Sequence, residues 1–338
     1  MKWGVCELDE GRRVDVVSPA SSANVGPGFD LCALALGNPS CRVSVEFAER
    51  DSLDVRGGFA VPGRVEDNKV FNVIAGMRAE YGLRGALRVS LDNSIPVGKG
   101  LGSSGASCAG AAVALNELFG LGMGKEELVR FASLGETGLS LNEIESLGGL
   151  DDAIERGLVH LDNVSASIFG GLAVVTSFRP LKVKTFAFPE CELILVLPER
   201  AKPSTEFARK VLPGTIARNL EIANRRNLSG LLCGVFARDA RAVIDSLEEF
   251  VVEPARSVAG LLPNYAQVRQ AAIGLGFGAA VSGAGPSILI VGEKGDANVG
   301  ALLARVHSIF SASGVGFDVL RTSVYEKGAS VVSHGNTA

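Results

Sequence analysis

Apolar and polar positions alternate along the first third of the chain. Residues 42–47 read Arg-Val-Ser-Val-Glu-Phe, and β-forming residues also cluster at 53–55 and 87–91. Alternation with a period of two is typical of a strand that buries one face. These three segments therefore predict strands, and the first third should be rich in β-structure.

Helical patterns follow from residue 104 onward. Residues 104–119 are rich in alanine and leucine, lack proline and end at Gly120, which predicts a buried helix with a glycine stop. Residues 125–134 place Leu128 and Phe131 on one face, with acidic residues near the positive N-terminal end. We expect further helices at 206–212, 220–236 and 268–273, buried strands at 168–177 and 193–197, and another strand at 287–291.

Strands and helices in both halves predict an α+β or mixed α/β protein. The 338 residues favour two domains, because single cores rarely grow past about 250 residues. The pattern breaks at Phe178-Arg-Pro180, so we place domains at 1–178 and 179–330. Residues 331–338 form a polar, flexible tail in this interpretation.

Composition limits the kinds of partner. With 47% apolar residues, 21% charged residues and a net charge of −4, the chain suits a compact protein that has no basic surface for nucleic acid. Its six cysteines form no Cys-x-x-Cys pair, and its apolar runs are too short for a membrane span. Residues 1–10 lack the apolar core of a targeting signal. We expect a soluble cytoplasmic protein without membrane partners.

A glycine-rich loop carries the clearest chemical signal. Residues 96–104 read Pro-Val-Gly-Lys-Gly-Leu-Gly-Ser-Ser and lead directly into the predicted helix. Alternate glycines allow close approach of the backbone, and a helix start offers free N–H groups and a positive dipole end. No Gly-Lys-Ser/Thr ends the loop, so it is not a Walker A motif. It predicts a polyphosphate site built from main-chain donors.

Other interpretations of this loop stay open. Residues 100–105 also satisfy the dinucleotide pattern G-x-G-x-x-G, which is weak by itself. In a dinucleotide site the glycines follow a parallel strand directly, whereas Asn-Ser-Ile-Pro at 93–96 intervenes here. A dinucleotide-dependent oxidoreductase and a purely structural turn are the alternatives.

Three more segments complete a recognisable set. They read Pro-Ala-Ser-Ser-Ala-Asn-Val-Gly-Pro-Gly-Phe-Asp at 19–30, His-Leu-Asp-Asn-Val-Ser-Ala-Ser-Ile-Phe-Gly-Gly at 160–171 and Val-Ser-Gly-Ala-Gly-Pro-Ser at 281–287. Alone, the first would be a turn in which Asn24 and Asp30 bind local backbone. Together with the glycine loop, the segments resemble the GHMP kinase superfamily and, within it, the homoserine kinase family.

The resemblance implies a fold and a reaction. The fold would be α+β, with an N-terminal ribosomal-S5-like domain, a C-terminal ferredoxin-like domain and the site in the cleft between them. The reaction would be ATP-dependent phosphorylation of the homoserine side-chain hydroxyl, with Mg²⁺, in a homodimer. Rival interpretations are a GHMP kinase for shikimate or mevalonate, and a non-catalytic member of the superfamily.

The resemblance also assigns residues to the nucleotide. Asn68 would lie by the adenine, and Ser104 and Glu136 would hold Mg²⁺, a cation that prefers oxygen ligands. The phosphates would contact Pro96, Gly98, Lys99, Gly100, Leu101, Gly102, Ser103, Ser104 and Gly105.

For the substrate, the resemblance implies that Asp30 receives the amino group and that Asn24 and Asn163 flank the attacking hydroxyl. Arg209 and Arg256 would hold the carboxylate, a task suited to a planar guanidinium, with His160 nearby. Phosphoryl transfer depends mainly on alignment and charge neutralisation, so Asn163, Asn24 and Lys99 could act without a strong base.

Two features depart from the family pattern. Gly105 stands where the family usually has alanine, which should loosen the helix start slightly. Residues 138–159 look like an insertion that contains a short acidic helix at 151–156. This insertion makes Asp152 and Glu155 alternative metal ligands to Glu136.

Overall fold

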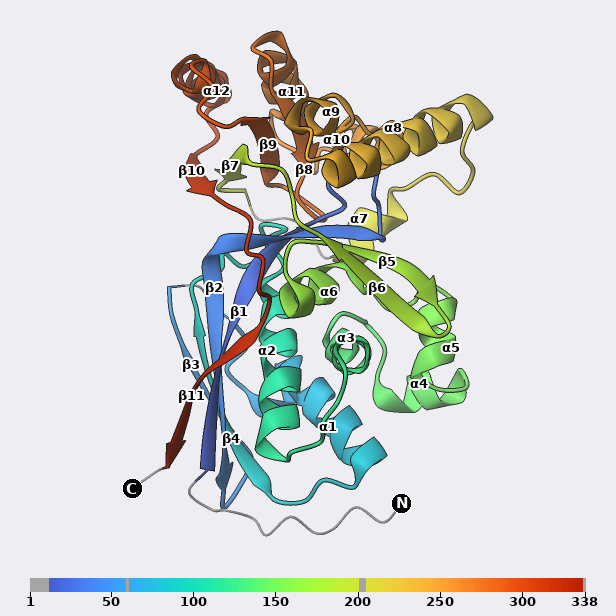
Figure 1. Cartoon of the computed structure of the whole chain (residues 1–338), viewed down its shortest axis with the longest axis vertical. Coiled ribbons are helices and arrows are strands. Elements are labelled where there is room, and N and C mark those ends of the chain that lie inside the picture. Colours follow the sequence, from blue (N-terminus) through green and yellow to red (C-terminus); the bar gives the residue numbers. More distant parts are fainter. Residues whose placement is uncertain (1–11, 59–60, 201–204, 337–338) are drawn as a thin grey trace.

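The chain folds around two β-sheets with helices packed against each (Figure 1). A computed structural model describes residues 12–58, 61–200 and 205–336. The N-terminal residues from which we expect no targeting signal lie outside these ranges. Strands and helices mix in both halves, so the predicted α+β class is confirmed.

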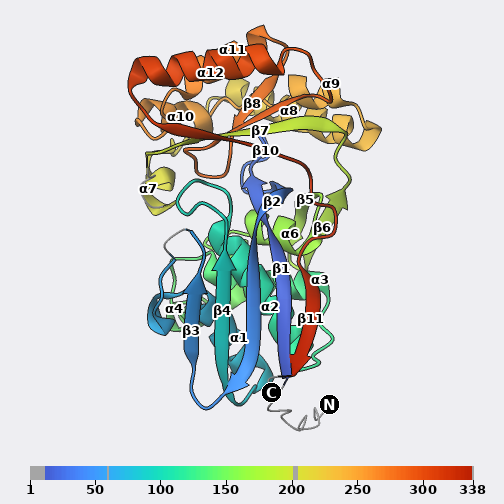
Figure 2. The ribbon, with the colours of Figure 1, turned by 90° about the vertical axis from the view of Figure 1, so that its left-hand side faces the viewer.

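The first sheet is almost entirely antiparallel. Its strands are β1 (Arg12–Ala23), β2 (Cys32–Ala48), β3 (Ser52–Arg56), β4 (Ala86–Asn93), β5 (Leu172–Phe178), β6 (Leu181–Phe186) and β11 (Ser330–Asn336). They follow the order β11-β1-β2-β4-β3, with the β5–β6 hairpin attached to β2. Only β3 and β4 pair in parallel among the described strands. Figure 2 shows this sheet with its helices behind it.

Helices cover one face of the first sheet. They are α1 (Val70–Tyr81), α2 (Ser103–Leu118), α3 (Lys125–Ala132), α4 (Leu141–Ser146), α5 (Leu150–Glu155) and α6 (Asp162–Phe169), with short 3-10 turns at Val65–Asp67 and Ser133–Gly135. Helix α2 packs against β1 and β2 and buries most of its residues. Its small side chains bring the helix close to the sheet, which fixes the glycine loop at its start.

The second sheet consists of strands β7 (Cys191–Pro198), β8 (Gly278–Val281), β9 (Ile288–Glu293) and β10 (Phe317–Thr322), which run antiparallel in the order β10-β7-β9-β8. Strands β7, β8 and β9 of this sheet are largely buried, whereas its edge strand β10 is partly exposed. The accompanying helices are α7 (Thr205–Lys210), α8 (Arg218–Ala237), α9 (Ala240–Asp245), α10 (Val252–Val258), α11 (Tyr265–Gly274) and α12 (Val299–Ser313). Alternate residues of β7 pack toward α11 and α12 or toward the other core, which explains its continuous apolar run.

Most predicted elements are confirmed, with small shifts at their ends. The segments at 42–47, 53–55, 87–91, 193–197 and 287–291 lie in strands, and those at 104–119, 125–134, 206–212, 220–236 and 268–273 lie largely in helices. The strand expected at 168–177 begins only at Leu172, because Ile168 still belongs to α6.

The end of the chain differs from the prediction. Residues 330–336 are not a flexible tail but strand β11, which pairs antiparallel with β1. The boundary expected near residue 178 falls in the turn of the β5–β6 hairpin, and both strands belong to the first sheet. The chain passes to the second sheet only after Phe186. None of the described helices is long and apolar enough to cross a bilayer.

Candidate active site

A cavity of ≈ 340 Å³ lies where the two sheets and their helices meet. Its wall combines the loop after β1, the turn before α1, the glycine loop, the starts of α2 and α6, helices α7 and α10, and the loop after β8. The structure brings all the predicted site residues to this cavity except Lys99 and Gly105. Segments far apart in sequence therefore form a single site.

The glycine loop leads into α2 with its carbonyl groups already bound. Leu101 O accepts from Ser21 N at 3.1 Å, and Gly100 O accepts from the hydroxyl of Ser282 at 2.8 Å. The loop residues also line the cavity at the start of a 16-residue helix. Backbone N–H groups and the positive end of the helix dipole are therefore available to an anion there.

Two glycines of this loop have no room for a side chain. A Cβ at Gly100 would lie 2.2 Å from Ser282 O, and one at Gly102 would lie 2.2 Å from the hydroxyl oxygen of Ser21. Both residues also have positive φ, +78° and +66°. The loop conformation thus requires glycine on grounds of both space and backbone geometry.

Lys99 and Gly105 have contacts outside the cavity wall. The ammonium group of Lys99 donates to the carbonyl of Pro198 at the end of β7, and burial lowers its pKa. A Cβ at Gly105 would lie 3.0 Å from Cβ of Asn163, so the absence of a side chain lets α6 approach α2 closely.

A buried carboxylate stands beside the helix start. Glu136 lines the cavity, and its Oε1 is buried without a hydrogen-bond partner in the described structure. The hydroxyl of Ser104 donates to Gly135 O at 3.4 Å, which places it next to this acid in the fold. An orphaned anionic oxygen suits a divalent cation. No cluster of three or more His, Cys, Asp or Glu that could hold a metal occurs among the described residues.

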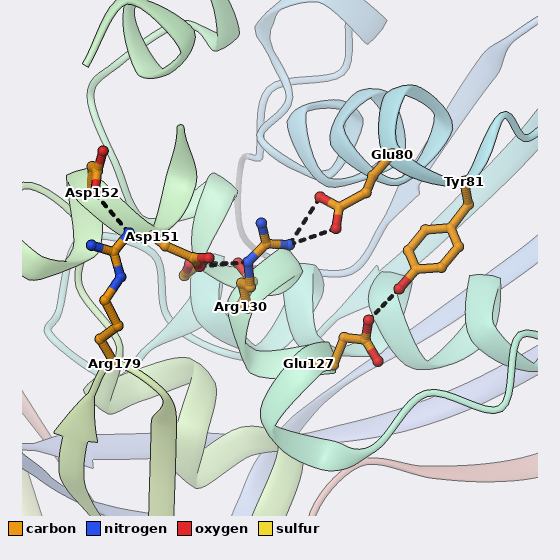
Figure 3. A network of polar contacts seen from close by, with 8 residues as sticks. Glu80, Tyr81, Glu127, Arg130, Asp151, Asp152 and Arg179 are labelled. Carbon is orange, nitrogen blue, oxygen red and sulfur yellow. Dashed lines mark hydrogen bonds and ion pairs between the residues drawn. The ribbon is translucent and has the colours of Figure 1, made fainter. Parts of the chain in front are cut away.

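The alternative metal ligands lie elsewhere. The predicted acidic helix is present as α5, and Asp152 pairs with Arg179 at 2.7 Å (Figure 3). Glu155 pairs with the same arginine at 3.0 Å, and neither acid lines the cavity. Arg130 joins Asp151 and Glu80 in the same view. These ion pairs attach the segment 138–159 to the body of the protein.

The predicted substrate residues form a charged cluster at the other end of the cavity. Arg209 lies 2.5 Å from Asp30 and 2.9 Å from Nδ1 of His160. Burial and the guanidinium charge lower the pKa of His160 to about 4, so its imidazole is neutral at pH 7 and Nδ1 accepts from Arg209. The ring of Phe29 packs beneath both Arg209 and Arg256.

Asparagine and arginine side chains connect this cluster to the loop after β8. Gly283 O accepts from Asn24 Nδ2 at 2.8 Å and from Arg256 at 2.9 Å. Asn24 and Asp30 both have positive φ, a conformation that Asn and Asp tolerate better than most residues. Across the cavity, Asn163 Oδ1 accepts from the hydroxyl of Ser21 at 2.8 Å.

Sequence reasoning missed four charged residues near the site. Three of them line the cavity next to residues that the motifs did identify, and this adjacency was the available signal: Asp67, Lys69 and Asp162. Glu253 lies behind the wall, where it accepts from Val281 N at 2.7 Å and from the hydroxyl of Tyr265. It links the helix that carries Arg256 to the strand before Gly283, and only the fold reveals this.

Glu253 should make stability depend on pH. Burial raises its pKa from 4.5 to about 8, so the folded state binds this proton more tightly than the unfolded state. The contribution of Glu253 to the free energy of unfolding should therefore be fully present below pH 4.5 and be lost as pH rises to about 8. Glu253→Gln should reduce the pH dependence of the free energy of unfolding. The dependence due to Asp162, whose pKa burial raises to about 7, should remain. Urea denaturation of wild type and variant from pH 5 to 8.5 measures this dependence for each, and an equal dependence in the two proteins would contradict the role of Glu253.

A glycine-rich loop at a helix start, a buried acid beside it and a cavity between two α+β lobes fit the GHMP class of small-molecule kinases. The profile "GHMP kinases N terminal domain" matches residues 68–171. The chain is 35% identical to homoserine kinase from Methanococcus maripaludis, over 84% of this chain and 89% of that protein. It is 31% identical to homoserine kinase from Thermoplasma volcanium, over 89% of this chain and 91% of that protein. The chain belongs to the homoserine kinase family.

Solved structures agree. Homoserine kinase from Cytophaga hutchinsonii superimposes with a TM-score of 0.79 at 28% identity, covering 98% of this chain and all of that one. Mevalonate diphosphate decarboxylase from Staphylococcus aureus has a TM-score of 0.69 at 15% identity, which shows a shared fold alone.

Proposed function

We propose that this protein transfers the γ-phosphoryl group of ATP to the side-chain hydroxyl of L-homoserine. One observation carries the proposal: a single cavity joins a main-chain phosphate site to a cluster of Asp30, Arg209 and Arg256. An amino acid offers an ammonium and a carboxylate to opposite charges of this kind. Family membership points to the same reaction.

The nucleotide would occupy the end of the cavity near α1 and the glycine loop. Val61, Pro62 and Val97 give this end an apolar wall for a base. The side chain of Asn68 donates to Pro62 O at 2.7 Å and accepts from Val70 N at 3.1 Å. Asn68 would therefore shape the adenine pocket by holding its own turn.

The amino acid would occupy the charged end. Asp30 and Arg209 neutralise each other in this structure, and a zwitterion can replace that pair with two new ones. Its ammonium would bind Asp30, and its carboxylate would bind Arg209 and Arg256. Asn24 and Asn163 would orient the side-chain hydroxyl toward the phosphate loop.

The chain's own groups would catalyse transfer mainly by alignment and charge stabilisation. Loop N–H groups and the α2 dipole would hold the triphosphate, and the arginines would fix the acceptor. Ser104 and Glu136 would hold Mg²⁺, which when bound supplies positive charge to the phosphate oxygens. Lys99, whose ammonium is bound to Pro198 O, would support the loop from behind.

Rival functions fit the site less well. Shikimate and mevalonate carry a carboxylate but no ammonium, so either would leave Asp30 without a cationic partner. A dinucleotide site needs glycines after a parallel strand within a parallel sheet, and β4 here has an antiparallel neighbour, β2. A coupled assay of ADP release with homoserine, shikimate and mevalonate tests the proposal. Turnover of another alcohol in preference to homoserine would overturn it, and ATP binding without any turnover would support a non-catalytic member.

Glu136→Gln should weaken the response to Mg²⁺. The amide keeps the shape but removes the negative charge, so the Mg²⁺ concentration for half-maximal activity should rise about tenfold or more. A magnesium titration of initial rates measures this. Glu155→Gln is the matched control, because that carboxylate pairs with Arg179 at the surface. Equal titrations for wild type and Glu136→Gln would contradict the role.

The homodimer and the cytoplasmic location expected from the sequence stay predictions.

A further inference from the structure

Lys69 is a cation of the cavity wall that the proposed function leaves without a task. It directly follows Asn68 and is the last residue before α1. The residue is exposed, and it lines the same cavity as Glu136 and the glycine loop. Its side chain forms no ion pair with a carboxylate in the part of the chain that the structure describes. The charge of Lys69 is therefore available to a ligand in the cavity.

The turn that carries Lys69 packs beside the predicted metal ligand. A Cβ at Gly135 would lie 3.4 Å from Lys69 O, and Gly135 directly precedes Glu136. Lys69 O also accepts from Asn72 N at 3.1 Å, which closes the first turn of α1. The hydroxyl of Ser104, at the start of α2, donates to the carbonyl of the same Gly135. The backbone of Lys69 is thus held close to the start of α2.

The charge of Lys69 acts on groups at both ends of the cavity. Burial is the main cause of the low pKa of His160, at the acceptor end, and Lys69 lowers that pKa further. Burial and the charge of Glu136 raise the pKa of the Cys108 thiol on α2, and Lys69 opposes this rise. The side chain therefore lies near the start of α2 as well as the acceptor cluster, which is where the transferred phosphoryl group must pass.

The other cations near the cavity have different positions. Arg209 and Arg256 pack on the ring of Phe29 at the acceptor end. Lys99 belongs to the glycine loop, but its ammonium group donates to the carbonyl at the end of β7, and the residue does not line the cavity. Among the described residues that line the cavity, Lys69 is the remaining cation.

We propose that Lys69 is a catalytic residue that binds the triphosphate of ATP through its ammonium group. The inference rests on the proposed function and deepens it at the nucleotide end. A triphosphate beside Glu136 brings more negative charge than one Mg²⁺ neutralises, and the ammonium offsets part of the rest. It donates charge-assisted hydrogen bonds to phosphate oxygens and forms no covalent bond, so it keeps its protons during transfer. A lysine is a flexible point charge that can follow the phosphoryl group toward the acceptor.

Lys69→Met tests the inference by binding alone, without an acceptor. Methionine keeps an apolar stem and removes the charge. Calorimetry measures the affinity of wild type and variant for AMP and, with Mg²⁺, for a non-hydrolysable ATP analogue. We expect the variant to bind the analogue about 10- to 100-fold more weakly, the usual contribution of a hydrogen bond to a charged group, and AMP within about twofold. A residue that merely shaped the adenine turn would weaken the binding of both nucleotides equally.

Three further variants complete the comparison. Lys69→Arg keeps a positive charge and should recover most of the affinity for the analogue. Lys184→Met is the matched control, because Lys184 is exposed on β6 and does not line the cavity, so neither affinity should change. Lys69→Gln removes the charge but keeps a polar end, and it replaces Lys69→Met if thermal unfolding shows that the methionine variant is not folded.

Turnover gives a second measurement. With homoserine as acceptor, Lys69→Met should lower kcat/KM for ATP about tenfold or more and leave KM for homoserine within about twofold. A folded, uncharged variant that binds the analogue as tightly as wild type overturns the inference, and so does an equal loss of affinity for AMP and the analogue. Wild type that binds the analogue but does not phosphorylate homoserine contradicts the proposed function instead, and the binding comparison still decides the role of Lys69.

Discussion

Gly100→Ala is expected to abolish ATP-dependent activity. The new Cβ would lie 2.2 Å from Ser282 O, and a φ of +78° is unfavourable for alanine by roughly 1–2 kcal/mol. The glycine loop must then move away from the loop after β8, which contains Ser282. A displacement of about 1 Å at a reacting phosphate can cost about 100-fold in rate, and we expect at least that loss in kcat/KM. Initial rates and calorimetric ATP binding measure it.

Gly98→Ala is the matched control for this variant. Its φ of +71° imposes a similar backbone cost, but a Cβ there meets no atom within 4 Å. We expect a far smaller loss of ATP affinity than for Gly100→Ala. Equal losses would show that backbone geometry alone matters, and an unchanged Gly100→Ala enzyme would refute the proposed phosphate site.

Asp30→Asn is expected to raise KM for homoserine about 10- to 100-fold. Hydrogen bonds to charged groups contribute roughly 1.5–3 kcal/mol, and the amide cannot neutralise an ammonium. The variant also removes the internal partner of Arg209. KM for ATP should stay within about twofold, because Asp30 lies at the acceptor end of the cavity. Steady-state kinetics with each substrate varied in turn provides the measurement.

Asp67→Asn is the control for the Asp30 variant. Asp67 also contributes a carboxylate to the cavity wall, but next to Asn68 at the predicted adenine end. The Asp67→Asn variant should therefore have the wild-type KM for homoserine. If Asp30→Asn likewise left homoserine KM unchanged, the amino-group role of Asp30 would be wrong.

The sequence was most informative where local geometry determines the residue type. Gly100 and Gly102 are predictable because a tight loop before a helix excludes side chains, and the helix itself follows from composition. The same is true of β7, whose apolar run reflects burial on both faces. These features depend on neighbouring residues, so the pattern along the chain contains them.

Features that depend on distant partners could not be predicted. Strand β11 has little apolar pattern of its own and owes its conformation to pairing with β1. The direction of the Lys99 side chain depends on Pro198, 99 residues away. Likewise, nothing in the sequence shows that Asp30 and Arg209, each assigned a different end of the substrate, bind each other.

The return of the chain from β10 to β11 limits how the two lobes can move. The chain crosses between the two sheets twice, once after Phe186 and once after Thr322. Two backbone hydrogen bonds attach the second crossing to β2: Gly37 N donates to Ser323 O at 2.7 Å, and Tyr325 N donates to Ala35 O at 3.0 Å. Two connections restrict the relative movement of the two lobes more than a single linker would. A nick in one of the two crossings would leave the lobes joined by the other.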